Sequence, residues 1–176
     1  MTTTNLKKSH QITLFAMTYF GWFACVFAGK FQLDLLAYFV PAIFLFLLHR
    51  FSGLNRNVLL AFGLLTIIGI SFDSLALKMG WIKLINAEVL WGVPHWLAAL
   101  WLLFVFSVPL YSGWLLKRRL FTAVLGFFLG PITYFSGSAF EVLLIEQKLH
   151  LLIYGFFWAA FFPGALWFYQ KQLAKN

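Results

Sequence analysis

The stretch VLLAFGLLTIIGISFDSLAL, residues 58–77, contains only one charged side chain, Asp73. A helix needs about 20 predominantly apolar residues to cross about 30 Å of hydrocarbon. This stretch therefore predicts a helix that spans a lipid bilayer. Similar apolar stretches recur along the chain and predict six spans, over residues 12–29, 33–48, 58–77, 96–116, 120–145 and 149–169.

The composition extends this prediction to the whole chain. Of its 176 residues, 62% are hydrophobic, 21% are aromatic and only 10% are charged, and the mean hydropathy is +0.88. About a quarter of the residues of a soluble domain are charged, so lipid is expected to cover most of this surface. The predicted fold class is all-α: a polytopic bundle of six transmembrane helices that forms a single domain over residues 1–176.

The distribution of charge predicts an orientation, because loops rich in Lys and Arg stay in the cytoplasm. With the N-terminus inside, nine basic residues lie in inner segments: Lys7, Lys8, Arg50, Arg56, Lys117, Arg118, Arg119, Lys171 and Lys175. Four lie in outer segments: Lys30, Lys78, Lys83 and Lys148. The acidic residues all lie toward the outside: Asp34, Asp73, Glu88, Glu141 and Glu146. Both termini are therefore expected in the cytoplasm, and the net charge of +8 is assigned to anionic lipid headgroups rather than to nucleic acid.

The longest predicted loop joins the third and fourth spans. It contains Trp81 and Trp91, which together with Trp96 are expected at the outer boundary of the membrane, since Trp favours the headgroup interface. Residues 81–91 mix these apolar anchors with polar positions. That mixture favours a short helix lying on the outer surface.

Asp73 is the sharpest candidate for a functional group, because an acidic side chain at membrane depth is costly and normally has a partner. Helical spacing places it on one narrow stripe with Thr66, Gly69 and Ala76, which are small enough to face other helices. One interpretation makes Asp73 the polar anchor of a binding site. The alternative is structural: Asp73 pairs with Lys78, or accepts hydrogen bonds from hydroxyl groups in the bundle, and so orients its helix.

A second small and polar face runs along the fifth predicted span. Its members recur at helical spacing: Gly126, Gly130, Tyr134, Gly137 with Ser138, and Glu141. Gly126 and Gly130 form a GxxxG pair, which permits close contact between helices. Glu141 is either a solvated residue at the outer boundary or, if it faces inward, a residue at the depth of Asp73.

His95 follows Pro94 at the outer start of the fourth predicted span, where Pro suits the first helical turn. If Asp73, His95 and Glu141 converge there, they would form an acid/base set or a cation site. The HExxH, CxxC and GxSxG patterns do not occur. The histidines lie at predicted helix ends, which argues against haem: His10, His49, His95 and His150. The sequence therefore predicts no cofactor and no bound metal.

Prolines fall within four of the six predicted spans, at Pro41, Pro109, Pro131 and Pro163. Each removes a backbone hydrogen bond and tends to kink its helix. In transporters such breaks open a cavity or form a hinge. Proline is also simply more frequent in membrane helices than in soluble ones, so both interpretations stay open.

Short motifs in three parts of the chain carry a resemblance to a known family. They are Phe72-Asp-Ser74, Gly92-Val-Pro-His-Trp96 with Leu100-Trp-Leu-Leu-Phe104, and Gly130-Pro-Ile-Thr-Tyr134 with Ser136-Gly137. Over nearly the whole chain, the sequence resembles a family of small bacterial inner-membrane proteins classed as a domain of unknown function. The resemblance implies a Gram-negative inner membrane and a genomic association with fatty-acid or phospholipid modification, including cyclopropane-synthase-like methyltransferases. It supplies no activity, but it selects Asp73, His95, Trp96 and Tyr134 as positions to test.

The leading hypothesis is an inner-membrane protein that binds or transports an apolar or lipid-related molecule in a pocket open toward the outer leaflet. Asp73 would be its buried anchor and Tyr134 a hydrogen-bonding neighbour, with Trp96 beside them and His95 and Glu141 at the mouth. One alternative is a membrane-embedded lipid-modifying enzyme that uses Asp73 with His95 or Glu141. Another is a non-catalytic assembly partner. The expected partners are membrane lipids and a membrane protein or lipid-modifying enzyme, and nucleic acid is not expected.

Overall fold

The computed structural model describes residues 7–85, 87, 89 and 92–174. In chain order the elements of this part are α1 (Lys8–Lys30), the 3₁₀ helix η1 (Asp34–Tyr38), α2 (Phe39–Ser52), α3 (Arg56–Lys78), β1 (Ile82–Leu84), α4 (His95–Leu115), α5 (Arg119–Ala139), β2 (Leu143–Ile145) and α6 (His150–Leu173). Five of these helices are long and apolar enough to cross a membrane. The predicted all-α polytopic bundle is therefore confirmed.

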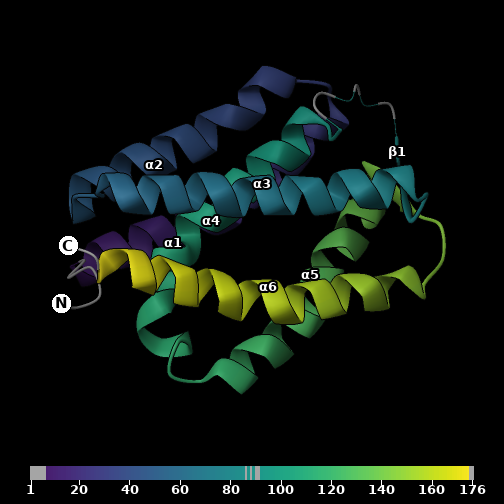
Figure 1. Ribbon diagram of the computed structural model, residues 1–176. Coiled ribbons are helices and arrows are strands. Elements are labelled where there is room, and N and C mark those ends of the chain that lie inside the picture. Colours follow the sequence, from purple (N-terminus) through teal and green to yellow (C-terminus); the bar gives the residue numbers. More distant parts are fainter. Residues whose placement is uncertain (1–6, 86, 88, 90–91, 175–176) are drawn as a thin grey trace.

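The bundle is organised around α4. The chain crosses back and forth along the bundle, so that both ends of the chain drawn in Figure 1 lie at the same end of the molecule. Helix α4 is the most buried of the five long helices and packs against α1, α2, α3 and α6. Pro109, Pro131 and Pro163 lie inside α4, α5 and α6, as the sequence predicts.

The second predicted span forms the shortest α-helix of the described part. It begins with η1 and continues as α2, whose 14 residues give about 21 Å of helix. Pro41 lies in the first turn of α2, where a missing N–H costs least. The helix is followed by Gly53, whose φ of 61° is the left-handed conformation common after a helix C-terminus. Asn55 then caps α3 by accepting the Val58 N–H at 2.8 Å.

The segment predicted as a surface helix is instead partly a strand. Residues of β1 pair antiparallel with β2, with Ile82 opposite Ile145. Ile82 is fully buried while Lys83 is exposed, so the period-2 alternation of a half-buried strand replaces the helical period expected there. The polar and aromatic positions Glu88 and Trp91 of the predicted helix lie outside the described residues.

The fifth predicted span is also too long. Helix α5 ends at Ala139 instead of continuing to residue 145. Two residues later, Glu141 has a left-handed φ of 60°, a conformation that cannot continue an α-helix. The chain then enters β2, whose Leu143 is buried and whose Leu144 is exposed. The two strands thus join the loop after α3 to the loop after α5.

Glycines allow α5 to pack closely on α6. A Cβ atom added at Gly126 would lie 2.4 Å from the carbonyl oxygen of Trp158, and one at Gly130 would lie 2.2 Å from the indole Cδ1 of the same residue. On the other helix, an added Cβ at Gly155 would lie 3.0 Å from the ring and carbonyl oxygen of Phe127. The close contact predicted from the GxxxG pair is confirmed.

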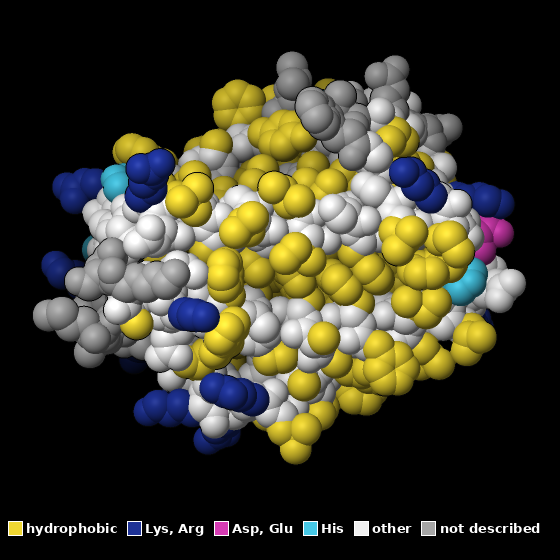
Figure 2. Space-filling model, viewed as in Figure 1, with side chains coloured by type: hydrophobic (Ala, Val, Ile, Leu, Met, Phe, Trp, Pro, Cys, Tyr) yellow, Lys and Arg dark blue, Asp and Glu magenta, His cyan; other side chains and the backbone are white. Residues whose placement is uncertain are grey.

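Charged side chains gather at the two ends of the bundle, with apolar side chains between them (Figure 2). One end, called the basic end here, is where α1, α3 and α5 begin with Lys8, Arg56 and Arg119. The other, called the sheet end, holds β1 and β2. It also holds two ion pairs, Lys30 with Glu141 at 3.1 Å and Lys83 with Glu146 at 2.9 Å. This separation of charge matches the distribution from which the orientation is predicted.

Candidate functional site

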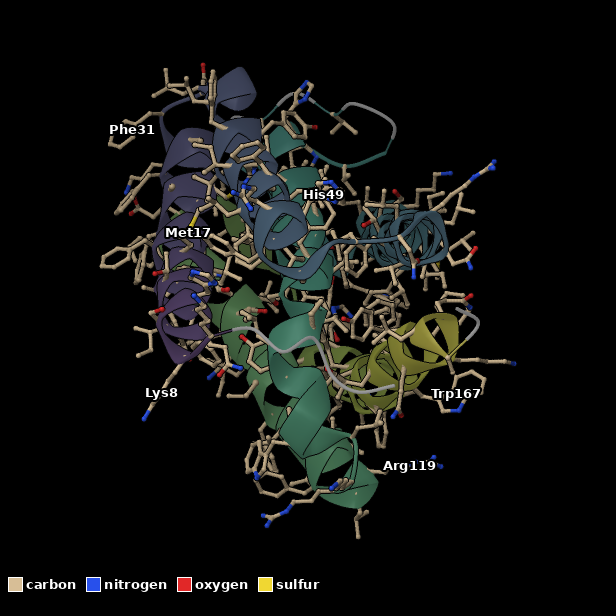
Figure 3. All side chains as sticks on the ribbon, turned by 90° about the vertical axis from the view of Figure 1, so that its left-hand side faces the viewer. Lys8, Met17, Phe31, His49, Arg119 and Trp167 are labelled. Atoms are coloured by element: carbon tan, nitrogen blue, oxygen red, sulfur yellow. The ribbon has the colours of Figure 1, made fainter. Side chains whose placement is uncertain are left out.

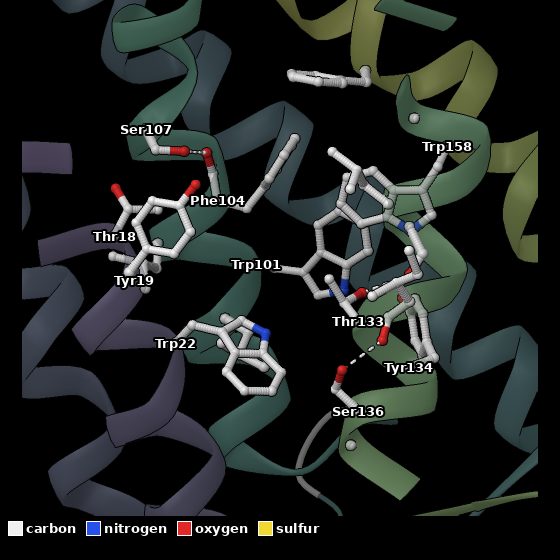
Figure 4. A pocket seen from close by; sticks show the side chains of 18 of the residues that line it. Thr18, Tyr19, Trp22, Trp101, Phe104, Ser107, Thr133, Tyr134, Ser136 and Trp158 are labelled. Atoms are coloured by element: carbon white, nitrogen blue, oxygen red, sulfur yellow. Dashed lines mark hydrogen bonds between the residues drawn. The ribbon is translucent and has the colours of Figure 1, made fainter. Parts of the chain in front are cut away.

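A groove of about 620 Å³ lies between α1 and α5. Helix α4 forms its floor, and α6 contributes Trp158 and Phe162. The space exists because α1 packs on α4 while α5 packs mainly on α6, so that α5 has little contact with α4. Figure 4 shows Thr18, Tyr19 and Trp22 of α1 on one side of this space, and Thr133, Tyr134 and Ser136 of α5 on the other, where Trp101 of α4 lies beside Trp158 of α6. Its volume falls in the range of about 300–1,000 Å³ typical of small-molecule sites.

The groove is long and opens sideways. On α4 its lining runs from Trp96 to Leu115, which at the helical rise corresponds to about 28 Å. Two residues that line its edges are exposed, Tyr19 of α1 by 62% and Ile132 of α5 by 54%. In a membrane-spanning bundle such an edge faces the hydrocarbon.

Most of the groove lining is apolar, and its serine and threonine hydroxyl groups are already occupied as donors. Thr18 donates to the Leu14 carbonyl at 3.0 Å, within its own helix. Ser107, Thr133 and Ser136 likewise donate to carbonyl oxygens of their own helices, at 2.6, 2.6 and 2.8 Å. The lining contains no charged side chain. These features suit an uncharged, largely apolar part of a ligand.

Asp73 lies behind the groove rather than in its lining. Its side chain is 0% exposed and accepts two hydrogen bonds, from Trp101 Nε1 to Oδ2 at 2.6 Å and from Tyr134 Oη to Oδ1 at 2.7 Å. Trp101 and Tyr134 do line the groove. Asp73 therefore fixes two groove side chains from the side that faces away from the groove.

The stripe predicted on α3 faces the bundle, because Thr66, Gly69, Asp73 and Ala76 are all buried. Gly69 makes room for the neighbouring indole: a Cβ added there would lie 2.2 Å from Cε3 of Trp101. The structural alternative for Asp73 is an ion pair with Lys78 or a hydrogen bond from a hydroxyl group. The structure contains the second, a hydrogen bond donated by the hydroxyl of Tyr134. The two ion pairs of the described residues do not include Lys78.

Helix α6 completes the surroundings of Asp73. The indole rings of Trp101 and Trp158 stack, with centroids 5.1 Å apart and an interplanar angle of 5°. The rings of Tyr134 and Tyr154 lie 3.9 Å apart. Four helices, α3 to α6, thus meet at one polar cluster, defined here as Asp73, Trp101 and Tyr134.

His95 and Trp96 have separate environments at the sheet end of α4. His95 Nδ1 lies 3.2 Å from the hydroxyl oxygen of Tyr38, and His95 is not part of the groove lining. Trp96 is buried and lines the groove. Its indole lies against Gly29 of α1, where an added Cβ would come within 2.4 Å of Cδ1.

Glu141 belongs to a third environment. It pairs with Lys30 at the end of α1, and its side chain is 73% exposed. The preceding residue, Phe140, contacts the rings of Trp22, Phe23 and Phe27 with centroid distances of 5.6–6.0 Å. These contacts join α1 to the end of α5. In the part of the chain that the structure describes, Asp73, His95 and Glu141 therefore have different hydrogen-bond partners, while Asp73, Tyr134 and Trp101 do come together.

Trp101 is the important residue that the sequence reasoning missed. From the sequence, Trp81, Trp91 and Trp96 are interpreted as anchors at the membrane boundary and Trp96 also as a site residue, but no role is assigned to Trp101, which lies six residues inside α4. A buried indole N–H usually has a hydrogen-bond partner. A tryptophan in the middle of a span was therefore the available signal for a polar group on another helix.

The fold and the groove define a multi-pass α-helical membrane protein. Residues 11–164 match a family model described as a protein of unknown function (DUF2878), and the chain belongs to this family. The predicted membership of a family of unknown function is thus confirmed. Neither the curated proteins nor the solved structures gave a match.

Proposed function

We propose that this protein binds an apolar or lipid-related molecule in the groove between α1 and α5, and so stores, presents or transports it. The observation that carries the proposal is the groove itself: about 620 Å³ of space with a mainly apolar lining and exposed edges on two membrane-spanning helices. A tightly packed bundle without a ligand would have no such space. We also propose the bacterial inner membrane as its location, because helical spans with cationic inner loops are typical of that membrane.

The polar cluster gives one point of recognition along a mainly apolar surface. Tyr134 and Trp101 lie about one and a half turns from the sheet ends of α5 and α4, and both groups are held in place by Asp73. In the predicted orientation this point is in the outer half of the membrane. The role proposed for Asp73 is therefore positional, and the side chains that touch the ligand are those of Tyr134 and Trp101.

An enzymatic reaction that uses Asp73 directly is less well supported by this geometry. Both carboxylate oxygens already accept a hydrogen bond, and Trp101 and Tyr134 separate Asp73 from the groove. His95 and Glu141 bond to Tyr38 and Lys30 instead. We therefore propose that the protein binds a ligand and does not use Asp73 in a chemical reaction.

Filling the groove tests the proposal. Leu100 lines the groove from α4 and is partly buried, so Leu100→Trp is expected to occupy part of the space. The matched control is Leu64→Trp, because Leu64 is 53% exposed on α3 and is not part of the lining. Each protein would be purified in a mild detergent, and the lipids retained per protein would be measured by mass spectrometry.

We expect Leu100→Trp to retain several-fold less lipid than the wild type and Leu64→Trp to retain the same amount. Thermal unfolding of all three proteins, monitored by circular dichroism, would show that the variants are folded. Equal lipid retention by a folded Leu100→Trp protein and its control would contradict the proposal.

A further inference from the structure

The groove ends at a strongly basic turn. Lys117 and Arg118 lie in the connection between α4 and α5, Arg119 is the first residue of α5, and all three are exposed. One residue, Leu116, separates them from Trp114 and Leu115, the last residues of α4 that line the groove. A molecule that fills the groove to this end would therefore reach three consecutive cations.

One of these cations is held over the groove lining. The Cζ atom of Arg118 lies 5.5 Å from the ring centroid of Trp114. Trp114 lines the groove and is 55% exposed. This cation–π contact places the guanidinium at the end of the apolar space.

The turn keeps its shape without help from the basic side chains. The buried hydroxyl of Thr122 lies 2.9 Å from the Leu115 carbonyl oxygen and 3.1 Å from the Arg118 carbonyl oxygen. These contacts tie the end of α4 to the start of α5 through the backbone. The charged side chains of the turn are thus available to a ligand.

No acidic partner at the basic end balances these cations within the part of the chain that the structure describes. The acidic side chains in its two ion pairs, Glu141 and Glu146, lie at the sheet end, and Asp73 is buried. In Figure 3, which faces the basic end, Lys8 of α1 and Arg119 of α5 lie on either side of α4. The mouth of the groove at this end therefore carries uncompensated positive charge.

From this arrangement we infer that the groove takes an anionic glycerophospholipid. Its acyl chain lies between α1 and α5, and its phosphate contacts Lys117, Arg118 and Arg119. The inference rests on the function proposed above. It adds the class of ligand and the orientation of the lipid, with its headgroup at the basic end. Charge complementarity carries it, since the lining has no charged group for a phosphate, while Lys117, Arg118 and Arg119 lie exposed where the lining on α4 ends. The lipid enters from the leaflet that faces the basic end.

The test neutralises the turn and compares two defined lipids. The variant Lys117→Gln/Arg118→Gln/Arg119→Gln would be titrated with phosphatidylglycerol and with phosphatidylcholine in detergent micelles, and bound lipid would be measured by native mass spectrometry. The matched control is Arg50→Gln/Arg56→Gln/Lys171→Gln. It removes the same number of cations from the basic end, at the ends of α2, α3 and α6, and none of the three lines the groove.

We expect the wild type and the control variant to prefer phosphatidylglycerol over phosphatidylcholine by about tenfold or more, because each cation near an anionic headgroup contributes on the order of 1 kcal/mol and about 1.4 kcal/mol is tenfold in affinity. The turn variant is expected to lose this preference and to keep its affinity for phosphatidylcholine. Retention of the preference by the turn variant would overturn the inference, as would an equal loss in both triple variants, which would indicate general attraction to anionic surfaces.

The groove variant separates this inference from the proposed function. If Leu100→Trp loses both lipids while the turn variant keeps its preference, the groove binds lipid and the headgroup assignment is wrong. If Leu100→Trp binds both lipids as the wild type does, the proposed function itself fails.

Discussion

The hydroxyl oxygen of Tyr134 lies 2.7 Å from Oδ1 of Asp73 and joins α5 to α3, two helices that otherwise have little contact. The other carboxylate oxygen, Oδ2, accepts the indole N–H of Trp101 on α4. One buried carboxyl group therefore sets the relative positions of three helices. Both of these partners line the groove. A substitution of Asp73 is therefore expected to affect ligand binding by moving Tyr134 and Trp101.

Asp73→Asn is expected to lower lipid binding several-fold while membrane insertion stays intact. The amide oxygen can still accept one hydrogen bond, but its NH₂ group is a donor that would face the N–H or O–H of a partner. The side chain of Tyr134 or Trp101 would then shift at the groove wall. Retained lipid and the amount of folded protein in the membrane would be measured together. Loss of folded protein, instead of loss of binding, would show that Asp73 serves only the stability of the bundle.

Tyr134→Phe is expected to destabilise the protein by about 0.6–2 kcal/mol, the range found for hydrogen bonds between membrane helices. In a double-mutant cycle with Asp73→Asn the two effects should not add, because both changes act on the same hydrogen bond. The midpoint of unfolding in a denaturing detergent would provide the measurement.

Tyr154→Phe is the matched control for that cycle. The hydroxyl of Tyr154 is buried and has no hydrogen-bond partner within the part of the chain that the structure describes. Its removal should be neutral or stabilising, since an unpaired buried polar group is unfavourable. A loss as large as that of Tyr134→Phe would contradict the assignment of the hydrogen bond to Tyr134.

Gly126→Ala is expected to destabilise the contact between α5 and α6 by about 1–3 kcal/mol, the usual effect of overpacking. The new methyl group would meet the backbone carbonyl of Trp158, which cannot move aside as a flexible side chain does. Gly63→Ala on α3 is the control, because a Cβ atom there meets no atom within 4 Å. Thermal unfolding of both variants checks the prediction, and equal midpoints would show that the two helices are not in close contact at Gly126.

A disulfide should form between β1 and β2 in Lys83→Cys/Leu144→Cys. These two residues are opposite each other in the antiparallel pair, which corresponds to a Cα separation of about 4.5–5.5 Å and suits disulfide geometry. Oxidation followed by mass spectrometry of a proteolytic digest would detect the cross-link. The single variant Lys83→Cys is the control for linkage to the native Cys25, which is buried. A double variant that stays reduced under mild oxidation would argue against this register.

The sequence predicted well where one helix alone decides the outcome. The stripe of Thr66, Gly69, Asp73 and Ala76 is buried because a single helical period places these residues on one face. Gly126 and Gly130 allow a close helix contact for the same reason. The sequence predicted poorly beyond Ala139, where apolar residues continue but enter a strand instead of a helix. There the structure is determined by the pairing of β2 with β1. The paired strands, Ile82–Leu84 and Leu143–Ile145, lie 61 residues apart in the sequence.

The amino-acid sequence by itself determined a polytopic membrane bundle with most of its basic residues at one end. It could do so because the ability of a helix to cross hydrocarbon depends on the composition of contiguous residues. The distribution of basic residues among the loops follows from the sequence in the same way. Only the tertiary structure decided that Asp73 lies behind Trp101 and Tyr134, that His95 and Glu141 have other partners, and that a groove separates α1 from α5. Those features depend on which faces of helices distant in sequence meet. Here α5 packs mainly on α6 and only slightly on α4, its other neighbour in the sequence, because the small residues of α5 fit against α6.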